Sequence, residues 1–187
     1  MTLSYGRWLF LKGGFQSMEV MEALAGRQSV KTYLPKPIEQ EKLDKVLEAG
    51  RLAPSAFNHQ YRRFVVLTDP EVKKAVREKA GAQLMVESAP VVIVLCPTEE
   101  NDFVMPCGEK NYPIDMALCG AHMMLEAYEQ GLGSCWLGTF DTNAVKQVLG
   151  IPEDVKVVTL MPMGYHDGTQ ERKTRKPLHE IVSYNAY

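Results

Sequence analysis

The stretch from Asp115 to Gln130 constrains the fold most, because it has a helical pattern and scarcely a charge. Apolar residues recur along it at Met116, Leu118, Ala121, Met123, Met124, Leu125 and Ala127. A helix that is apolar nearly all round has no face that prefers water. We therefore expect this helix to be buried, either across the middle of the protein or at an interface with a second chain.

The other apolar patterns predict helices and strands that follow one another loosely along the chain. Helices are expected around Met21–Ala25, Leu43–Gly50, Pro70–Val76 and Thr142–Leu149, and strands over Phe64–Leu67, Pro90–Leu95 and Val155–Leu160. The run over residues 90–95 is apolar throughout, which is typical of a central strand covered on both faces. Residues 98–111 are polar and are expected to form a long loop. Because the alternation is too loose for an all-parallel sheet, the sequence predicts an α+β fold with a mixed central β-sheet flanked by helices.

Length and composition favour one globular domain. The 187 residues suffice for one well-buried core and are few for two. We expect residues 18–187 to form that domain, with residues 1–17 as an N-terminal extension or a mis-assigned start that precedes the natural Met18. No apolar run is long enough to span a bilayer, and the patch after Arg7 is too short for a signal peptide. A net charge of −2 argues against a general nucleic-acid binder.

The cysteines show no metal-binding pattern. Cys96, Cys107, Cys119 and Cys135 form no Cys-x-x-Cys pair, and no histidine lies at ligand spacing from them. We predict no metal site and interpret all four as reduced core thiols of a cytoplasmic protein.

Polar side chains recur at every second residue in two segments far apart in the sequence. Arg27, Ser29 and Lys31 would share one side of an extended segment, and Lys173 and Arg175 repeat the spacing. Guanidinium, ammonium and hydroxyl donors suit a long anionic ligand. Either segment alone is more often a solvated surface. Gly-x-Gly-x-x-Gly and Gly-Lys-Ser/Thr loops are missing, so an anion would be held by side-chain cations with help from backbone amides.

Two further segments lie between these cations. Residues 53–60 form a turn-rich stretch that presents the amide of Asn58, although a locally bonded asparagine is the more frequent explanation. Residues 131–140 hold three glycines, which permit close approach of the backbone to a flat partner. Trp136 in that segment is, by itself, more often a core residue.

Together these segments resemble the nitroreductase family of FMN-dependent oxidoreductases from about Met18 to Val182. The matching motifs are Arg27-x-Ser29-x-Lys31, Ala53-Pro-Ser55-x-x-Asn58-x-Gln60, Asp115-Met-Ala-Leu, Gly131-Leu-Gly-Ser-Cys-Trp136-Leu-Gly138, Met161-Pro-Met-Gly164-Tyr and Lys173-x-Arg175-Lys-Pro177-Leu178. Each motif is weak alone, but six in the right order over most of the chain are specific.

The resemblance implies a set of FMN-binding residues. Arg27, Ser29, Lys173 and Arg175 match positions that hold the phosphate and ribityl end, and Lys31 matches one that reaches the N1/C2 edge of the ring. Asn58 matches the amide that bonds the pyrimidine ring, and Trp136, Leu137, Gly138 and Thr139 match the segment behind it. Gln28, Ser55 and Gln60 fall within the same motifs and complete the set. No catalytic side chain is implied, since flavin N5 carries the chemistry.

The implied activity is an NAD(P)H-dependent FMN oxidoreductase. It would pass a hydride from NAD(P)H through flavin N5 to a nitroaromatic, quinone or similar small-molecule acceptor by a ping-pong mechanism. The family also implies an intertwined homodimer whose flavin sites draw residues from both chains. Alternatives are a flavin- or nucleotide-binding protein without turnover, or a specialised chemistry such as dehalogenation or flavin breakdown. Many relatives carry Pro-Trp where this chain has Tyr61-Arg62, so the rim beside the ring is expected to differ.

Overall fold

The computed structural model describes residues 18–98, 103–169 and 173–187. The predicted extension over residues 1–17 lies outside these ranges. The elements in chain order are α1 Val20–Gly26, α2 Gln40–Leu52, η1 Ala56–Asn58, β1 Arg63–Leu67, α3 Pro70–Lys79, α4 Met85–Ser88, β2 Val91–Cys96, α5 Tyr112–Glu129, β3 Gly133–Ser134, α6 Thr142–Leu149, β4 Thr159–Gly164 and η2 Leu178–Glu180. The prediction of an α+β fold is confirmed.

The described strands form one four-stranded sheet in the order β1-β2-β4-β3. All three strand pairs are antiparallel, with Val65 opposite Val94 and Ile93 opposite Met161. A parallel contact is made by the isolated bridge between Ser29 and Ser134 at the β3 edge. The pairing between the named strands is therefore antiparallel, and this isolated bridge is the parallel contact that makes the arrangement mixed.

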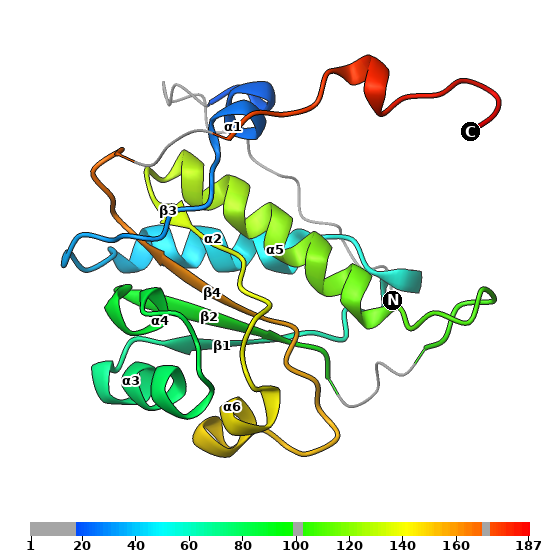
Figure 1. The fold of residues 1–187 in the computed structure, drawn as a ribbon. Helices are drawn as coiled ribbons and strands as arrows, with labels where there is room; N and C mark the ends of the chain where they lie inside the picture. Colours follow the sequence, from blue (N-terminus) through cyan, green and yellow to red (C-terminus); the bar gives the residue numbers. More distant parts are fainter. Residues whose placement is uncertain (1–17, 99–102, 170–172) are drawn as a thin grey trace, which may run out of the picture.

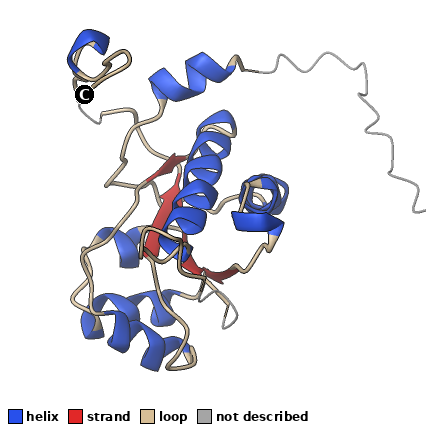
Figure 2. Cartoon of the chain, turned by 90° about the vertical axis from the view of Figure 1, so that its right-hand side faces the viewer, coloured by secondary structure: helices blue, strands red, loops and turns tan. Residues whose placement is uncertain are grey.

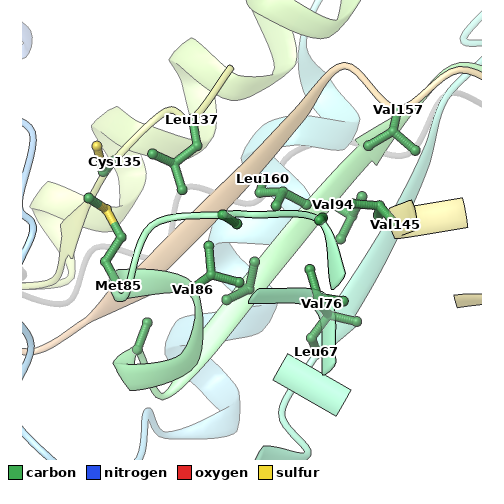
Figure 3. Close-up of a cluster of buried hydrophobic side chains, with 14 of the residues drawn as sticks. Leu67, Val76, Met85, Val86, Val94, Cys135, Leu137, Val145, Val157 and Leu160 are labelled. Carbon is green, nitrogen blue, oxygen red and sulfur yellow. The ribbon is translucent and has the colours of Figure 1, made fainter. Parts of the chain in front are cut away.

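Helices cover both faces of the sheet (Figures 1 and 2). α2 and α5 pack on one face, and α3, α4 and α6 pack on the other. β2 explains how both layers form, since all six of its residues are buried and successive side chains point to opposite faces. Val92 and Val94 join the cluster beneath α3 and α6 (Figure 3), whereas Ile93 and Leu95 join the cluster beneath α2 and α5. The predicted central strand is confirmed.

Aspartate side chains cap two of the helices, α3 and α6. The Asp69 carboxylate accepts hydrogen bonds from the backbone N–H groups of Glu71 and Val72, and Asp141 caps α6 in the same way. Proline at the start of α3 fits its fixed φ. α1 and α2 also lie where the apolar patterns placed them. α4 and β3 were not predicted, because elements of four and two residues are too short to show a period.

Two expectations were wrong in position. The last strand runs over Thr159–Gly164, four residues later than predicted. Val155 and Val157 are buried, but they pack in the core beside α6 and lie outside the strand. Their apolar character therefore reflects core packing. Cys107 is exposed, unlike the other three cysteines, so it is not the core thiol expected from the sequence.

α5 is buried on one face only in the single chain. Met116, Cys119 and Met123 are fully buried against α2 and the sheet. Leu118, Met124 and Leu125 on the rest of the surface are only half-buried. The expectation that this helix is buried all round is therefore not met within one chain, and an apolar strip is left partly open to solvent.

Candidate functional site

The segment over residues 27–31 is extended and lies beside β3. The Val30 N–H donates to the Ser134 carbonyl at 3.0 Å, and Ser29 forms the parallel bridge with Ser134. Val30 is 1% exposed, whereas Ser29 and Lys31 are exposed. The predicted alternation is confirmed, because the odd-numbered polar residues share the face away from the core.

The second cationic segment meets the first in one cavity of about 150 Å³. Its walls are formed by the C-terminal end of α1, by the start of the extended segment and by the loop before η2. The lining residues are Leu24, Ala25, Gly26, Arg27, Gln28, Ser29, Lys173 and Arg175. Residues separated by nearly 150 positions in the sequence thus converge, and three of them carry a positive charge. A guanidinium fork and an ammonium on one concave wall suit a phosphate group.

Gln28 gives this cavity a polar group in need of a partner. Among the described residues, its side-chain Oε1 is buried without a hydrogen-bond partner. A buried amide oxygen without a partner is costly, so such a group indicates a missing donor. A polyol hydroxyl can supply that donor beside a phosphate. The residues present therefore fit the phosphate and ribityl end of FMN.

The buried thiol of Cys135 lies within electrostatic reach of several residues of the cationic segments. Burial raises the pKa of Cys135, while a hydrogen bond with Ser29 and the charges of Lys31, Arg27 and Lys173 act to lower it. The thiol therefore stays neutral near pH 7. Four predicted site residues from two distant segments thus act electrostatically on one sulfur atom.

The segment after β3 divides between core and surface. Trp136 packs against α5 at Gly120, where an added Cβ would lie 2.5 Å from the indole ring. Leu137 is 4% exposed and lies in the core cluster beneath α3 and α6 (Figure 3). Its N–H donates to the Leu160 carbonyl at 3.0 Å, and its carbonyl accepts from the Thr159 hydroxyl at 2.9 Å. The structure therefore commits Leu137 to the core, and Gly138 and Thr139 are the exposed residues of the predicted segment.

The loop between α2 and β1 contains Ser55, Asn58 and Gln60. Phe57, Asn58 and Gln60 have φ values of 49°, 57° and 59°, in the left-handed region. Such a conformation costs about 1–2 kcal/mol for a residue with a Cβ and less for asparagine. Backbone strain of this kind often occurs at ligand sites.

Hydrogen bonds to polar side chains hold this strained loop. The Gln60 N–H donates to the Ser55 hydroxyl at 3.0 Å, and the Ala56 N–H donates to the Asp115 carboxylate at 3.2 Å. Asp115 is 4% exposed on α5. Sequence reasoning assigned Asp115 only to a motif, although a lone acid near the start of an almost uncharged helix was a usable signal.

The helix α1, whose last residues line the cationic cavity, and the strained loop lie at opposite ends of α5 (Figure 1). Gly26 beside the cavity contacts Tyr128, whereas the loop is bonded to Asp115. Thirteen residues of α-helix separate these contacts, which is about 20 Å at 1.5 Å per residue. The structure therefore brings together the predicted residues of the N- and C-terminal segments. It does not bring Ser55, Asn58 and Gln60 of the same chain to them.

Other cavities offer less specific chemistry. The one of about 440 Å³ lies between β1, the end of β2 and the segment after α6, with Arg63 and Thr98 among mainly apolar walls. Within the described ranges, no group of three or more histidine, cysteine, aspartate or glutamate residues is placed to hold a metal ion. No helix in those ranges is long and apolar enough to cross a membrane.

The fold and the site define a class of protein: an α+β protein with a cavity whose cationic side chains suit a phosphate group. Comparison with known proteins gives the family. The Nitroreductase family model matches residues 24–112 and 77–165. An NADH dehydrogenase of Thermus thermophilus is 31% identical, with 88% of this chain and 95% of that protein covered. The chain belongs to the nitroreductase family, as the resemblance implied.

Two solved structures have the same fold. A nitroreductase family protein from Clostridium difficile has a TM-score of 0.81 and 32% identity, covering 91% of this chain and all of that chain. The NADPH:FMN oxidoreductase of Vibrio harveyi, determined with NAD+, also has a TM-score of 0.81, at 26% identity. It is covered over 77% of its length, and 90% of this chain is matched.

Proposed function

We propose that this chain is an NAD(P)H-dependent FMN oxidoreductase that reduces a small-molecule acceptor by a ping-pong mechanism. The observation that carries the proposal is the meeting of Arg27, Lys173 and Arg175 in one cavity with the unpartnered Gln28 oxygen. Relatives named NADPH-flavin oxidoreductase and FMN reductase [NAD(P)H] support the same reaction class.

Each side chain at the cavity has a distinct task. Arg27, Lys173 and Arg175 hold the phosphate by charge-assisted hydrogen bonds, which are stronger than hydrogen bonds between two neutral groups. Ser29 and Gln28 bond the ribityl hydroxyls. Bound FMN supplies the capacity to accept a hydride and pass it on.

The remaining residues act on the flavin ring. Lys31 lies on the same side of the extended segment as Ser29, and its ammonium favours negative charge at the ring edge. Gly138 and Thr139 present backbone N–H groups behind the ring. Because the ring carries the chemistry, these residues bind and orient, and no side-chain nucleophile is needed.

A homodimer completes the site in this proposal. Two α5 helices that pack antiparallel about a twofold axis place the Asp115 end of one chain beside the Tyr128 end of the other. Asn58 and Gln60 of the second chain then reach the ring above the cationic cavity. The half-buried apolar strip of α5 supports this arrangement, and Met116 and Met123 are excluded from it because they face their own sheet.

Exposed apolar residues beyond α5 also support a second chain. Val20, Met21 and Leu24 on α1 are between 50% and 72% exposed, and Leu178 and Ile181 in the C-terminal segment are 72% and 64% exposed. This segment runs away from the body of the chain (Figure 1). Contact with a partner would cover both surfaces, as obligate interfaces resemble a domain core cut in half.

The acceptor is proposed as a nitroaromatic, a quinone or a similar flat molecule. The proposal also keeps residues 18–187 as one domain and a cytoplasmic location for the reduced thiols Cys96, Cys119 and Cys135. These points rest on the sequence patterns and on the relatives. They are independent of the cavity described above.

Anaerobic reduction is the direct test. Protein loaded with FMN is mixed with NADH or NADPH, and the visible absorbance of the oxidised flavin is followed before an acceptor is added. Bleaching by the nicotinamide and recovery with a nitroaromatic or quinone are expected. Parallel double-reciprocal plots with varied acceptor would support the ping-pong order, and a protein that takes up no FMN would end the proposal.

Sedimentation tests the composite site. At low protein concentration, flavin absorbance is expected to sediment with a dimer. A monomer that keeps both FMN and activity would contradict the two-chain site.

A further inference from the structure

Arg62 occupies a position where the family resemblance gave no role. Its guanidinium Nη1 donates to the carbonyls of Gly50 at 3.2 Å and Ala53 at 2.9 Å, and it lies 3.1 Å from the Cys119 sulfur. The residue is half-buried. A side chain that reaches back nine and twelve residues and also touches another helix is unlike a solvated surface arginine.

Two of the three contacted groups lie at the end of α2, and the third lies on α5. Gly50 and Ala53 are at the C-terminal end of α2, where the helix dipole is negative, and the Gly50 carbonyl also accepts the Ala53 N–H. Cys119 is on α5 and is fully buried. One guanidinium therefore ties the end of α2 to α5 at the point where the loop over residues 53–62 begins and ends.

Asp115 provides a second anchor on the same face of α5. It lies four residues before Cys119, which is one helical turn, and accepts the Ala56 N–H. Asp115 thus holds the start of the loop, and Arg62 holds its end. Between the two anchors lie the left-handed residues Phe57, Asn58 and Gln60.

We propose that Arg62 is a positioning residue which, together with Asp115, fixes the loop so that Asn58 and Gln60 are presented to the flavin. This inference rests on the proposed function, because it assumes that the loop contacts FMN. It also gives the Tyr61-Arg62 departure a physical meaning. The chain closes this loop with a polar clamp.

The clamp works through one nitrogen of the guanidinium, Nη1. Burial raises the pKa of Cys119, and the adjacent Arg62 only partly opposes this, so the thiol is neutral near pH 7. The clamp is therefore not an ion pair with Cys119, and it works by directed donation to carbonyls and sulfur. Lysine also carries its donors on one nitrogen, but its side chain is shorter, so it can replace only part of this geometry.

The test compares Arg62→Met, Arg62→Lys and the matched control Arg63→Met. Arg63 is the next residue along, is exposed, and lies outside the cationic cavity and the loop contacts. Two quantities are measured: hydrogen exchange of the Ala56 and Gln60 amides in the flavin-free protein, and the Kd for FMN from fluorescence quenching. Arg62→Met is expected to speed exchange about tenfold, which corresponds to about 1.4 kcal/mol.

FMN affinity should fall in the variants in which amide exchange of the loop is faster. Arg62→Met is expected to weaken FMN binding by roughly five- to tenfold, Arg62→Lys by less, and Arg63→Met not at all. If Arg62→Met fails to fold, Arg62→Lys carries the test of Arg62, and Asp115→Ala tests the other anchor through exchange of the Gln60 amide, which Asp115 does not bond.

The outcomes separate the clamp from the proposed function. Unchanged exchange in Arg62→Met overturns the clamp. Faster exchange with unchanged FMN affinity overturns the positioning role, because the loop would then be held without serving the flavin. If the wild-type protein binds no FMN, the proposed function fails and the positioning role fails with it, while the exchange data still report whether Arg62 holds the loop.

Discussion

The two ends of α5 carry the two halves of the candidate site, and they are built differently. At the Tyr128 end, cations from two distant segments line a cavity, and specificity comes from charge. At the Asp115 end, a strained loop is held by single hydrogen bonds, and specificity comes from backbone shape. Loss of one side chain at the first end should therefore have a large effect on FMN binding. Loss of one hydrogen bond at the second end should have a smaller effect.

The largest effect is expected at the cationic end. Arg27→Ala or Arg175→Ala should each weaken FMN binding by about 1.5–3 kcal/mol, the scale of a hydrogen bond to a charged group. Titration of flavin fluorescence measures this. Lys176→Ala is the matched control, because Lys176 is exposed beside Arg175 but outside the cavity lining. Equal affinity in wild type and both arginine variants would place the phosphate elsewhere.

The packing of the extended segment at that end can be disturbed without changing a cationic side chain. A Cβ on Gly133 would lie 2.5 Å from the Val30 Cγ2 atom, so Gly133→Ala must displace the segment that carries Ser29. The expected loss of stability is about 1–3 kcal/mol, as for overpacked cores. Denaturant unfolding of the flavin-free protein measures it, with Gly138→Ala as the control, since nothing lies within 4 Å of a Cβ there. Equal unfolding midpoints for the two variants would show that the segment shifts without loss of stability.

A smaller effect is expected at the loop. Ser55→Ala removes the acceptor of the Gln60 N–H, a neutral hydrogen bond with a net contribution of about 0.5–1.5 kcal/mol. Faster amide exchange at Gln60 should report the loss, and Ser183→Ala in the exposed C-terminal segment is the control. A loss of FMN affinity as large as that of the arginine variants would remove the contrast between the two ends.

The smallest effect concerns the buried thiols below the two ends. Burial raises the pKa of both Cys135 and Cys119, so above the thiol pKa of the unfolded chain the unfolded state releases protons that the native state keeps. Stability is therefore fully present at neutral pH and falls as the pH rises through the native values. Unfolding free energies measured between pH 7 and strongly alkaline pH should fall less steeply in Cys135→Ala and Cys119→Ala. An unchanged slope in both variants would mean that neither thiol is perturbed.

The sequence predicted the residues of the cationic end well. The alternation of Arg27, Ser29 and Lys31 survives in the structure because Val30 between them is buried, and a period of two is a local property. The central strand and the helices α3 and α6 were predicted for the same reason. Each depends on neighbours within a few residues.

The sequence could not predict what depends on distant contacts. Leu137 matched a cofactor motif, yet its backbone and side chain are used by the core. Val155 and Val157 resembled a strand because buried core residues and strand residues are both apolar. Arg62 looked like a departure from a motif until its contacts with the end of α2 and with Cys119 were known.

The sequence by itself thus determined the family, the α+β class and the alternation of Arg27, Ser29 and Lys31, since ordered motifs and local periodicity record these. Only the tertiary structure decided which of these residues meet. It joined Arg27 to Arg175 through a cavity and separated both from Asn58 by the length of α5. The physical reason is that a helix is rigid and rises about 1.5 Å per residue, so residues bonded to its two ends cannot approach one another within one chain.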